Sequence, residues 1–260
     1  MGEATFQSQL QLLEAASLTL TLALLAYASW EDWKSREISD WVWVTLASAG
    51  GFLTALRMLL WGRPEPLLWI IGLALLTVLA LALYYVGFLG GADSKALICL
   101  GLALPELPSF LDPLLGVWIV FLPFTIVFNT FLLAALTVLY VALRNLCYWA
   151  RRGRIFDGFE GEPLRRKVAA FLVAYKVCRS KLPGNPSLSL AEEPSNGGRR
   201  WHFRFRIMEE PVSSLEGLPA EVWVTPQLPL LVFITLALIV SLAIGDLVLQ
   251  IIVWFLSIIL

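Results

Sequence analysis

The sequence has little histidine, little cysteine and little charge. With a single histidine, His202, a histidine-based metal site or a Ser-His triad has little to draw on. The three cysteines form no CxxC pair, which argues against a zinc ribbon and against a disulfide framework. We therefore expect neither a bound metal nor a cofactor.

Charged residues are also scarce. They make up 15% of the 260 residues, against about 25% in an average soluble domain. Hydrophobic residues make up 58%, and several apolar runs reach the roughly 18–20 residues needed to cross a bilayer. No basic residue precedes the first apolar run and no clear cleavage site follows it, so we expect a retained helix rather than a signal peptide. The sequence predicts a polytopic membrane protein.

The apolar runs predict an all-α membrane domain with six transmembrane helices. Their expected ranges are 12–30, 41–61, 67–89, 96–104, 114–143 and 229–260, the fourth being short for a span. We divide the chain into membrane helices 1–5 (1–143), a small α+β cytoplasmic domain (144–225) and a segment with the last helix (226–260).

Inside the polar insertion, residues 199–207 and 221–225 alternate in a way that predicts two paired strands, with His202 in a structural role. Residues 165–177 fit a helix or a strand equally well.

Basic residues predict the orientation of the helices. Of 19 Lys and Arg residues, only Arg57 and Arg63 fall on one side, and the side rich in basic residues is cytoplasmic. Both termini are then outside and the insertion is inside. The same topology places Asp32 and Asp93 at one membrane face, each after an apolar run of roughly twenty residues. Carboxylates at the edge of a bilayer are functional candidates.

Two neighbouring carboxylates can hydrolyse a peptide bond, because like charges at close range favour sharing one proton. Simpler interpretations stand beside this one: Asp32 as a solvated loop charge, and Asp93 as the N-cap of the fourth helix. We expect Arg36 and Lys95 to reach towards headgroups. Asp246 is expected inside the last helix near the outer surface, and we expect Asn129 to join helices.

Three stretches resemble the type IV prepilin peptidase family. Residues 27–38, YASWEDWKSREI, resemble its first aspartate motif, and GGADSK (90–95) resembles its GxGD motif. WVTPQLP (223–229) is similar to the archaeal branch, the preflagellin (pre-archaellin) peptidases. One motif glycine is replaced by Ala92, which adds a methyl group where the backbone turns.

The resemblance implies a GxGD-type aspartyl membrane protease with Asp32 and Asp93 as the catalytic pair, supported by Gly90, Gly91, Ala92 and Lys95. It would remove short basic leaders from archaellin or pilin precursors at the cytoplasmic face, cutting after glycine and without N-methylation. Glu31, Glu37 and Asp40 are either solvated or contact the basic leader.

Two other functions stay open: a presenilin-like or signal-peptide-peptidase-like protease, and a non-enzymatic transporter or scaffold. The expected partners are the precursor proteins and the lipid bilayer, with no nucleic acid.

Overall fold

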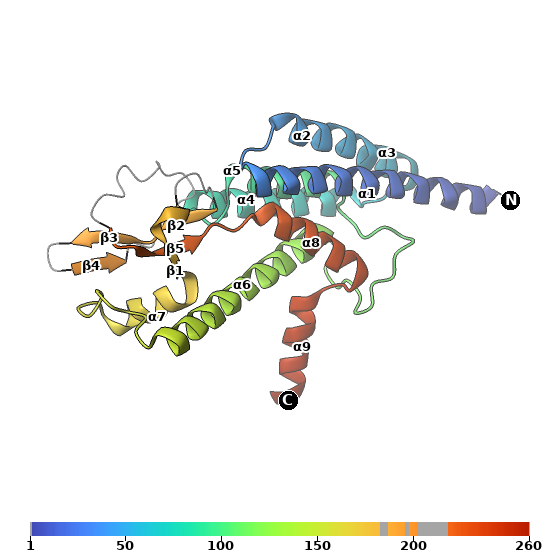
Figure 1. The fold of residues 1–260 in the computed structure, drawn as a ribbon. Helices are drawn as coiled ribbons and strands as arrows, with labels where there is room; N and C mark the ends of the chain where they lie inside the picture. Colours follow the sequence, from blue (N-terminus) through green and yellow to red (C-terminus); the bar gives the residue numbers. More distant parts are fainter. Residues whose placement is uncertain (1, 183–186, 196–197, 202–217, 260) are drawn as a thin grey trace. The chain divides into compact units, whose positions relative to one another are not determined.

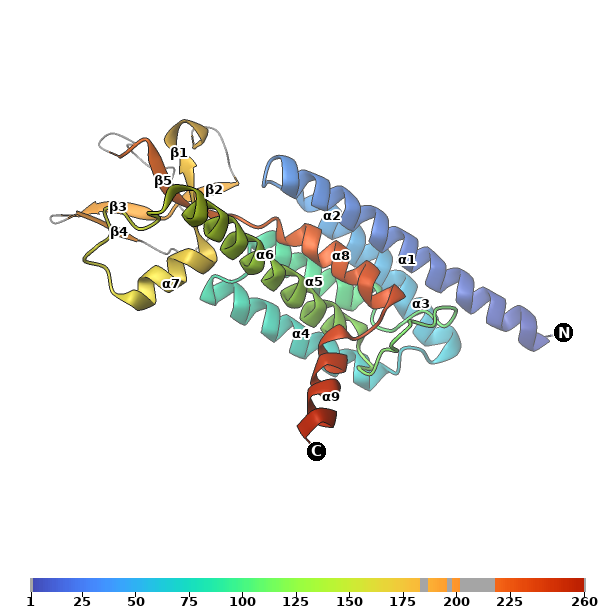
Figure 2. The same cartoon turned by 60° about the horizontal axis from the view of Figure 1, so that its bottom comes forward.

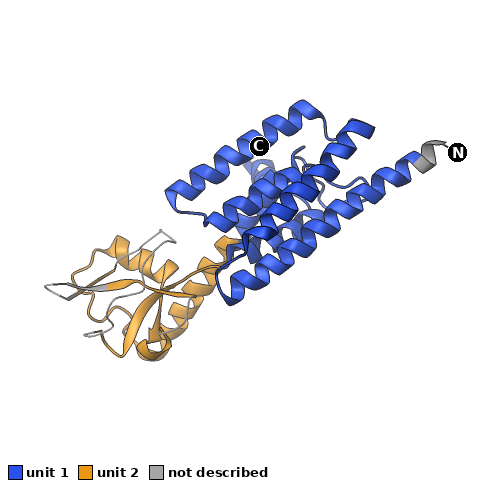
Figure 3. Cartoon of the chain, turned by 90° about the horizontal axis from the view of Figure 1, so that it is seen from above, with its two compact units in different colours: residues 1–133, 229–260 blue, residues 134–228 orange. Residues whose placement is uncertain are grey.

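The computed structural model describes residues 2–182, 187–195, 198–201 and 218–259. The chain forms two compact units, one of Met1–Leu133 with Pro229–Leu260 and one of Ala134–Leu228 (Figure 3). The first unit is helical. The second contains the small sheets.

The first unit is a bundle of helices, most of which pack side by side, with the last helix turned away from the others (Figure 1). Its elements are α1 (Gly2–Lys34), α2 (Asp40–Thr45), the π-helical turn η1 (Leu46–Gly50), α3 (Gly51–Trp61), α4 (Pro66–Val86), α5 (Gly91–Ala103), the start of α6 (Leu122–Arg152), α8 (Leu230–Ala243) and α9 (Leu247–Ile259). Four stretches of the described residues are long and apolar enough to cross a membrane: Phe6–Lys34, Asp40–Trp61, Pro66–Val86 and Leu122–Arg152. The pair α8 and α9, bent by 62°, is a fifth candidate. The chain is a multi-pass membrane protein.

The fourth predicted helix exists as α5. Its 13 residues extend for only about 20 Å at a rise of about 1.5 Å per residue, which is less than the hydrocarbon core of a bilayer. Instead, α5 lies among α1, α3, α4 and α8 and buries residues on every side (Figure 2). A helix that is apolar all round is suited to such a central position.

Small residues let neighbouring helices approach α5 closely. A Cβ atom on Gly50 would lie 2.3 Å from the Cβ of Ala103, and one on Gly101 would lie 2.9 Å from side-chain atoms of Leu73 and Leu76. Such close approach is typical of helix packing in membranes, where van der Waals contact replaces the hydrophobic effect as the driving force.

Several helix boundaries differ from the sequence prediction, two of them near the aspartates or at the start of a long span. α1 continues to Lys34, so Asp32 lies inside its last turn and not beyond the helix. α6 begins at Leu122 rather than near residue 114, because Pro123 is tolerated in the first turn of a helix but not in its interior, and Gly116 has a left-handed φ of +73°.

The predicted last helix is broken into α8 and α9. Gly245 separates them with a φ of +108°, a conformation that glycine adopts without steric cost. Its close packing against Gly116 would also exclude a side chain, since a Cβ atom there would lie 2.1 Å from the Gly116 carbonyl oxygen.

The second unit combines the end of α6 with α7 (Leu164–Val173), the 3-10 turn η2 (Arg179–Lys181) and five strands: β1 (Tyr175–Cys178), β2 (Leu188–Leu190), β3 (Glu192–Ser195), β4 (Gly198–Trp201) and β5 (Glu221–Pro226). β5 is the middle strand of an antiparallel sheet of order β1-β5-β2, and β3 pairs with β4. The segment 165–177 is thus a helix followed by a strand.

The strand prediction for residues 221–225 is confirmed, but the predicted pairing is wrong. β5 pairs with β1 and β2, whereas β4, which holds the first residues of the predicted 199–207 strand, pairs with β3. Alternation identifies a strand without naming its partner. His202 and the rest of that predicted strand lie outside the described residues.

We predict that Gly50→Ala destabilises the protein, whereas Gly51→Ala does not. A methyl group on residue 50 would overlap the Cβ and Cα atoms of Ala103, which cannot move aside because Cα belongs to the backbone. Nothing lies within 4 Å of a methyl group on residue 51. Overpacking of this kind costs about 1–3 kcal/mol. Thermal unfolding in detergent should show a Tm lowered by several degrees for Gly50→Ala alone. Equal Tm values for the two variants would contradict the packing described for α5.

Candidate active site

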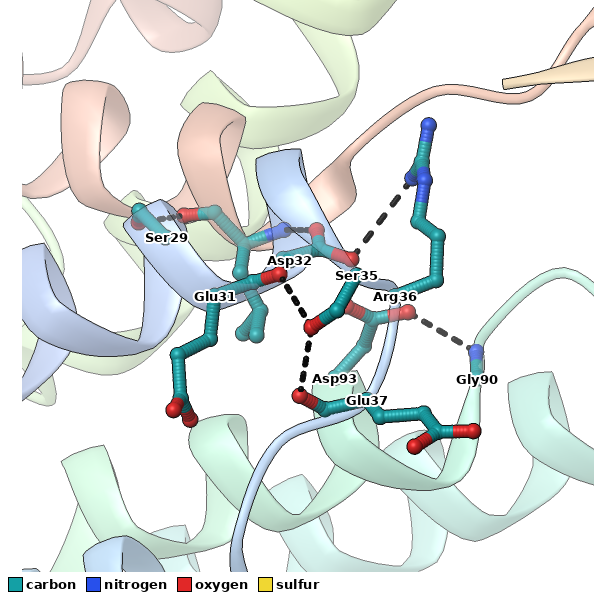
Figure 4. Close-up of polar contacts among 9 residues, drawn as sticks. Ser29, Glu31, Asp32, Ser35, Arg36, Glu37, Gly90 and Asp93 are labelled. Carbon is teal, nitrogen blue, oxygen red and sulfur yellow. Dashed lines mark hydrogen bonds and ion pairs between the residues drawn. The ribbon is translucent and has the colours of Figure 1, made fainter. Parts of the chain in front are cut away.

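Asp32 lies in the last turn of α1 with only 8% of its surface exposed. Its Oδ2 accepts a hydrogen bond from the backbone N–H of Leu231 at 3.4 Å, and its Oδ1 lies 3.6 Å from Nη1 of Arg36 (Figure 4). Leu231 belongs to the first turn of α8, where backbone N–H groups have no partner within the helix. The N-terminus of α8 therefore offers this carboxylate a donor and the positive end of a helix dipole.

Two hydroxyl side chains hold α8 against α1 beside Asp32. Ser29 donates to the carbonyl oxygen of Leu231 at 3.0 Å and lies 2.7 Å from the Thr235 hydroxyl. Thr235 also contacts the carbonyl oxygen of Leu25 at 3.3 Å. Sequence reasoning missed these residues. The available signal was two hydroxyl groups within apolar runs, a pattern that often joins membrane helices.

Asp93 lies in the first turn of α5 with 9% of its surface exposed. Its Oδ2 accepts the backbone N–H of Gly90 at 2.8 Å. The expectation that Asp93 could be the N-cap of this helix is corrected: Gly90 is the N-cap, with extended φ and ψ of −75° and 165°, and Asp93 reaches back to it from the third helical position. The carboxyl group thus stabilises the start of α5 and is fixed in place by it.

The two carboxyl groups lie at the same end of the helical unit, one from α1 and one from α5, which pack against each other (Figure 4). The charges of Asp32 and Arg36 both act on the Asp93 carboxyl group. Like charges on two largely buried carboxyl groups disfavour the ionisation of both. Such a pair can activate water and polarise a carbonyl group.

The two basic side chains near the aspartates pair with acidic side chains, whereas the sequence predicted that they would reach towards headgroups. Arg36 turns back to Asp32 instead of reaching to headgroups, and its φ of +62° is left-handed. Lys95 forms an ion pair with Asp40, with Nζ 2.6 Å from Oδ1. Ser35 holds the chain reversal by donating to the carbonyl oxygens of Glu31 and Glu37. These local bonds offset the cost of the left-handed residue.

The three acidic residues proposed as leader contacts differ in their surroundings. Glu31 accepts the hydroxyl of Tyr27, and Asp40 is already paired with Lys95. Glu37 is exposed, and its carboxylate has no ion-pair partner among the described residues. Glu37 and Asp40 are thus both exposed, but only Asp40 is already engaged in an ion pair.

The motif residues beside Asp93 fit without crowding. A Cβ on Gly91 would lie 3.9 Å from Tyr84, an ordinary contact. Ala92, which replaces the motif glycine, packs its methyl group against the hydrophobic core of the unit. The substitution is thus accommodated in this helix.

Asp246 and Asn129 have structural surroundings. Asp246 is only 2% exposed, lies at the break between α8 and α9, and accepts the backbone N–H groups of Trp118 and Ile119. It was expected inside the last helix, so that placement is wrong. Asn129 bonds to Ser241, to the carbonyl oxygen of Gly245 and to the N–H of Leu247, which confirms its role between helices.

Within the described part of the chain, no three His, Cys, Asp or Glu side chains form a group that could ligate a metal.

Comparison with known proteins agrees with this geometry. Residues 19–143, which include both aspartates, match the type IV leader peptidase family, and residues 208–247 match the archaeal peptidase A24 C-terminus type II. The chain belongs to the type IV leader peptidase family, and it is a protease.

Two relatives are similar over nearly their whole length. The chain is 27% identical over 236 residues to a preflagellin peptidase of Methanococcus voltae, which covers 88% of this chain and 94% of that protein. It is 28% identical over 240 residues to a preflagellin peptidase of Methanococcus maripaludis, with coverages of 89% and 96%. The resemblance inferred from the sequence motifs is confirmed.

We predict that Asp32→Asn and Asp93→Asn each abolish peptidase activity without unfolding the protein. The amide oxygen can still accept the hydrogen bonds from Leu231 or Gly90, but the amide can neither carry the charge nor share the proton. The expected loss in kcat is about 10²–10⁴-fold, the range for a positioned acid or base. The matched control is Asp112→Asn, an exposed aspartate in the segment that joins α5 to α6. Full turnover by either site variant would exclude the pair as the catalytic group.

Proposed function

We propose that this protein is a membrane aspartic endopeptidase that removes short basic leader peptides from archaellin or type IV pilin-like precursors, cutting after glycine at the cytoplasmic face. One observation carries the proposal. Asp32 and Asp93 are 61 positions apart in the sequence, yet both lie at one end of the helical unit. Both also belong to the segment that matches the leader peptidases. The names of the two archaeal relatives support preflagellin-type substrates.

In the proposed reaction the two carboxyl groups divide the chemistry. The ionised group takes a proton from the attacking water while the protonated group donates a hydrogen bond to the scissile carbonyl oxygen. The tetrahedral intermediate then collapses as a proton passes to the leaving amine. The shared proton belongs to the pair and not to either residue. Gly90 fixes the Asp93 carboxyl by its backbone N–H, and Gly91, Ala92 and Lys95 complete the first turn of α5.

The proposed topology has six membrane crossings, the fourth made by α5 together with the non-helical segment that follows it, because α5 alone is shorter than the hydrocarbon core. Lys34, Arg36 and Lys95 lie near the end of the bundle with the aspartates, whereas Arg57 lies inside α3 and Arg63 lies between α3 and α4. By the positive-inside rule the active site faces the cytoplasm and both termini are outside. We propose residues 144–225 as a cytoplasmic domain between the membrane segments 1–143 and 226–260.

The basic leader is proposed to meet the acidic side chains around the site. Glu37 is exposed and available, and Asp40 becomes available when Lys95 turns away. Glu31 already accepts a hydrogen bond from Tyr27, so we propose it only as a secondary contact for the leader. Membership of the leader peptidase family favours this function over a presenilin-like protease and over a transporter. No further class of function is favoured by an observation in the structure.

We predict that the purified protein in detergent or membranes cuts a precursor whose leader ends in Lys-Gly or Arg-Gly, directly after the glycine. The measurement is the mass of the two products. Replacing the glycine in the substrate by valine should abolish cleavage while leaving the rest of the precursor unchanged. Cleavage at another position, or equal cleavage of both substrates, would contradict the proposed specificity.

We also predict that Glu37→Gln weakens the use of a basic leader but not of a neutral one. An exposed ion pair contributes up to about 1 kcal/mol, which corresponds to roughly a fivefold loss in kcat/KM. The control is the same precursor with its leader lysines replaced by glutamine. The wild type and the variant should cut this substrate equally well. An equal loss on both substrates would show that Glu37 acts on folding or chemistry and not on leader charge.

A further inference from the structure

The end of α6 and strand β1 line an open pocket in the second unit, with a volume of about 350 Å³. Four of its lining side chains are cations: Arg144, Arg151, Arg152 and Lys176. No acidic residue lines it. A pocket with this concentration of positive charge is suited to an anion.

These cations take part in no close ion pair with the described acidic side chains. The ion pairs among the described residues, with N–O distances up to 4.0 Å, involve none of the four. The neighbouring acid, Glu221, accepts the hydroxyl of Tyr148 at the pocket wall. Burial lowers the pKa of Lys176 and the charge of Arg199 lowers it further, and the charges of Glu221, Asp157 and Glu192 compensate only in part. A bound anion would offset both effects.

Contacts with neighbouring side chains and backbone groups hold the walls of the pocket in place. The guanidinium group of Arg144 lies 3.9 Å from the centre of the Tyr175 ring, and Nζ of Lys176 lies 5.5 Å from the centre of the Tyr148 ring. The Asn145 amide donates to the carbonyl oxygens of Phe171 and Ala174 at 2.8 and 2.6 Å, which fixes α6 to the segment before β1. Cation–π contacts of this kind orient the charged groups before a ligand arrives.

The position of the pocket along α6 points to the source of the anion. Residues 122–143 of this helix contain no Lys, Arg, Asp or Glu, and Arg144 is its first charged residue. At a rise of about 1.5 Å per residue these residues extend for about 33 Å, close to the thickness of the hydrocarbon core. Arg144 therefore lies where headgroups begin, and the pocket lies among them.

We propose that this pocket binds the phosphate group of an anionic membrane lipid. A phosphodiester oxygen can accept hydrogen bonds from the guanidinium groups in the geometry that arginine favours. The four positive charges distinguish an anionic lipid from a zwitterionic one, whose ammonium group they would repel.

The test measures lipid binding to the full-length protein after delipidation in a non-ionic detergent. Short-chain phosphatidylglycerol, short-chain phosphatidylcholine and inorganic phosphate are titrated separately, and native mass spectrometry and thermal unfolding report the binding. The pocket variant is Arg151→Gln with Lys176→Gln. The matched control, Arg165→Gln with Lys181→Gln, removes the same charge from exposed positions of the same unit that lie outside the pocket.

We expect phosphatidylglycerol to bind more tightly than phosphatidylcholine, and the pocket variant to lose at least about tenfold in affinity while the control stays within about twofold. If the double variant does not fold, Arg151→Gln alone serves, because this side chain is exposed. Equal losses in the pocket variant and the control would overturn the proposal in favour of diffuse surface charge. Inorganic phosphate that binds as tightly as phosphatidylglycerol would overturn the lipid as the source. If the wild type binds neither phosphatidylglycerol nor inorganic phosphate, the proposed site itself is overturned.

Discussion

The burial of α5 at the centre of the helical unit is the constraint on which the active site depends. This short helix is too short to hold its place by spanning the bilayer, so its position is set by contacts on all sides. Gly50, Gly101 and Ala103 are small enough to permit those contacts. Because α5 is fixed by packing, Asp93 at its start is fixed as well, opposite the last turn of α1. A membrane protease thus obtains a rigid carboxyl group without extending a helix across the whole bilayer.

The surroundings of the two aspartates differ in a way that suits a shared proton. Asp32 has both oxygens engaged, one by Arg36 and one by the N-terminus of α8. Asp93 has one oxygen bonded to Gly90, and its Oδ1 has no hydrogen-bond partner among the described residues. The pair is therefore asymmetric before substrate binds. That asymmetry comes from three separate elements, α1, α5 and α8, and so depends on the packing of the whole unit.

The sequence was sufficient to single out Asp32 and Asp93 as candidates, because an acid that follows a long apolar run stands out from its neighbours by hydropathy. It was not sufficient to find Leu231, whose contribution is a backbone N–H and is independent of its side chain. Hydropathy also could not place the start of α6 or the break at Gly245, since both depend on backbone conformation and not on polarity. Arg36 was misplaced for a related reason: its left-handed φ turns the side chain back to Asp32. The predicted pairing of the strands was wrong because alternation is a property of a single strand, while pairing depends on two strands.

The distribution of positive charge in the structure serves two distinct purposes. Lys34, Arg36 and Lys95 lie at or near the ends of apolar helices beside the aspartates, and two of them are paired with acids there. The cations at the end of α6 have no such partners among the described residues and converge on one pocket. Orientation in the membrane requires only that positive charges be on the correct side. It does not require that four of them surround one cavity, and an unpaired, partly buried cation such as Lys176 carries a desolvation cost. The arrangement at α6 is therefore more than topology demands, and an anion bound there would supply the missing compensation.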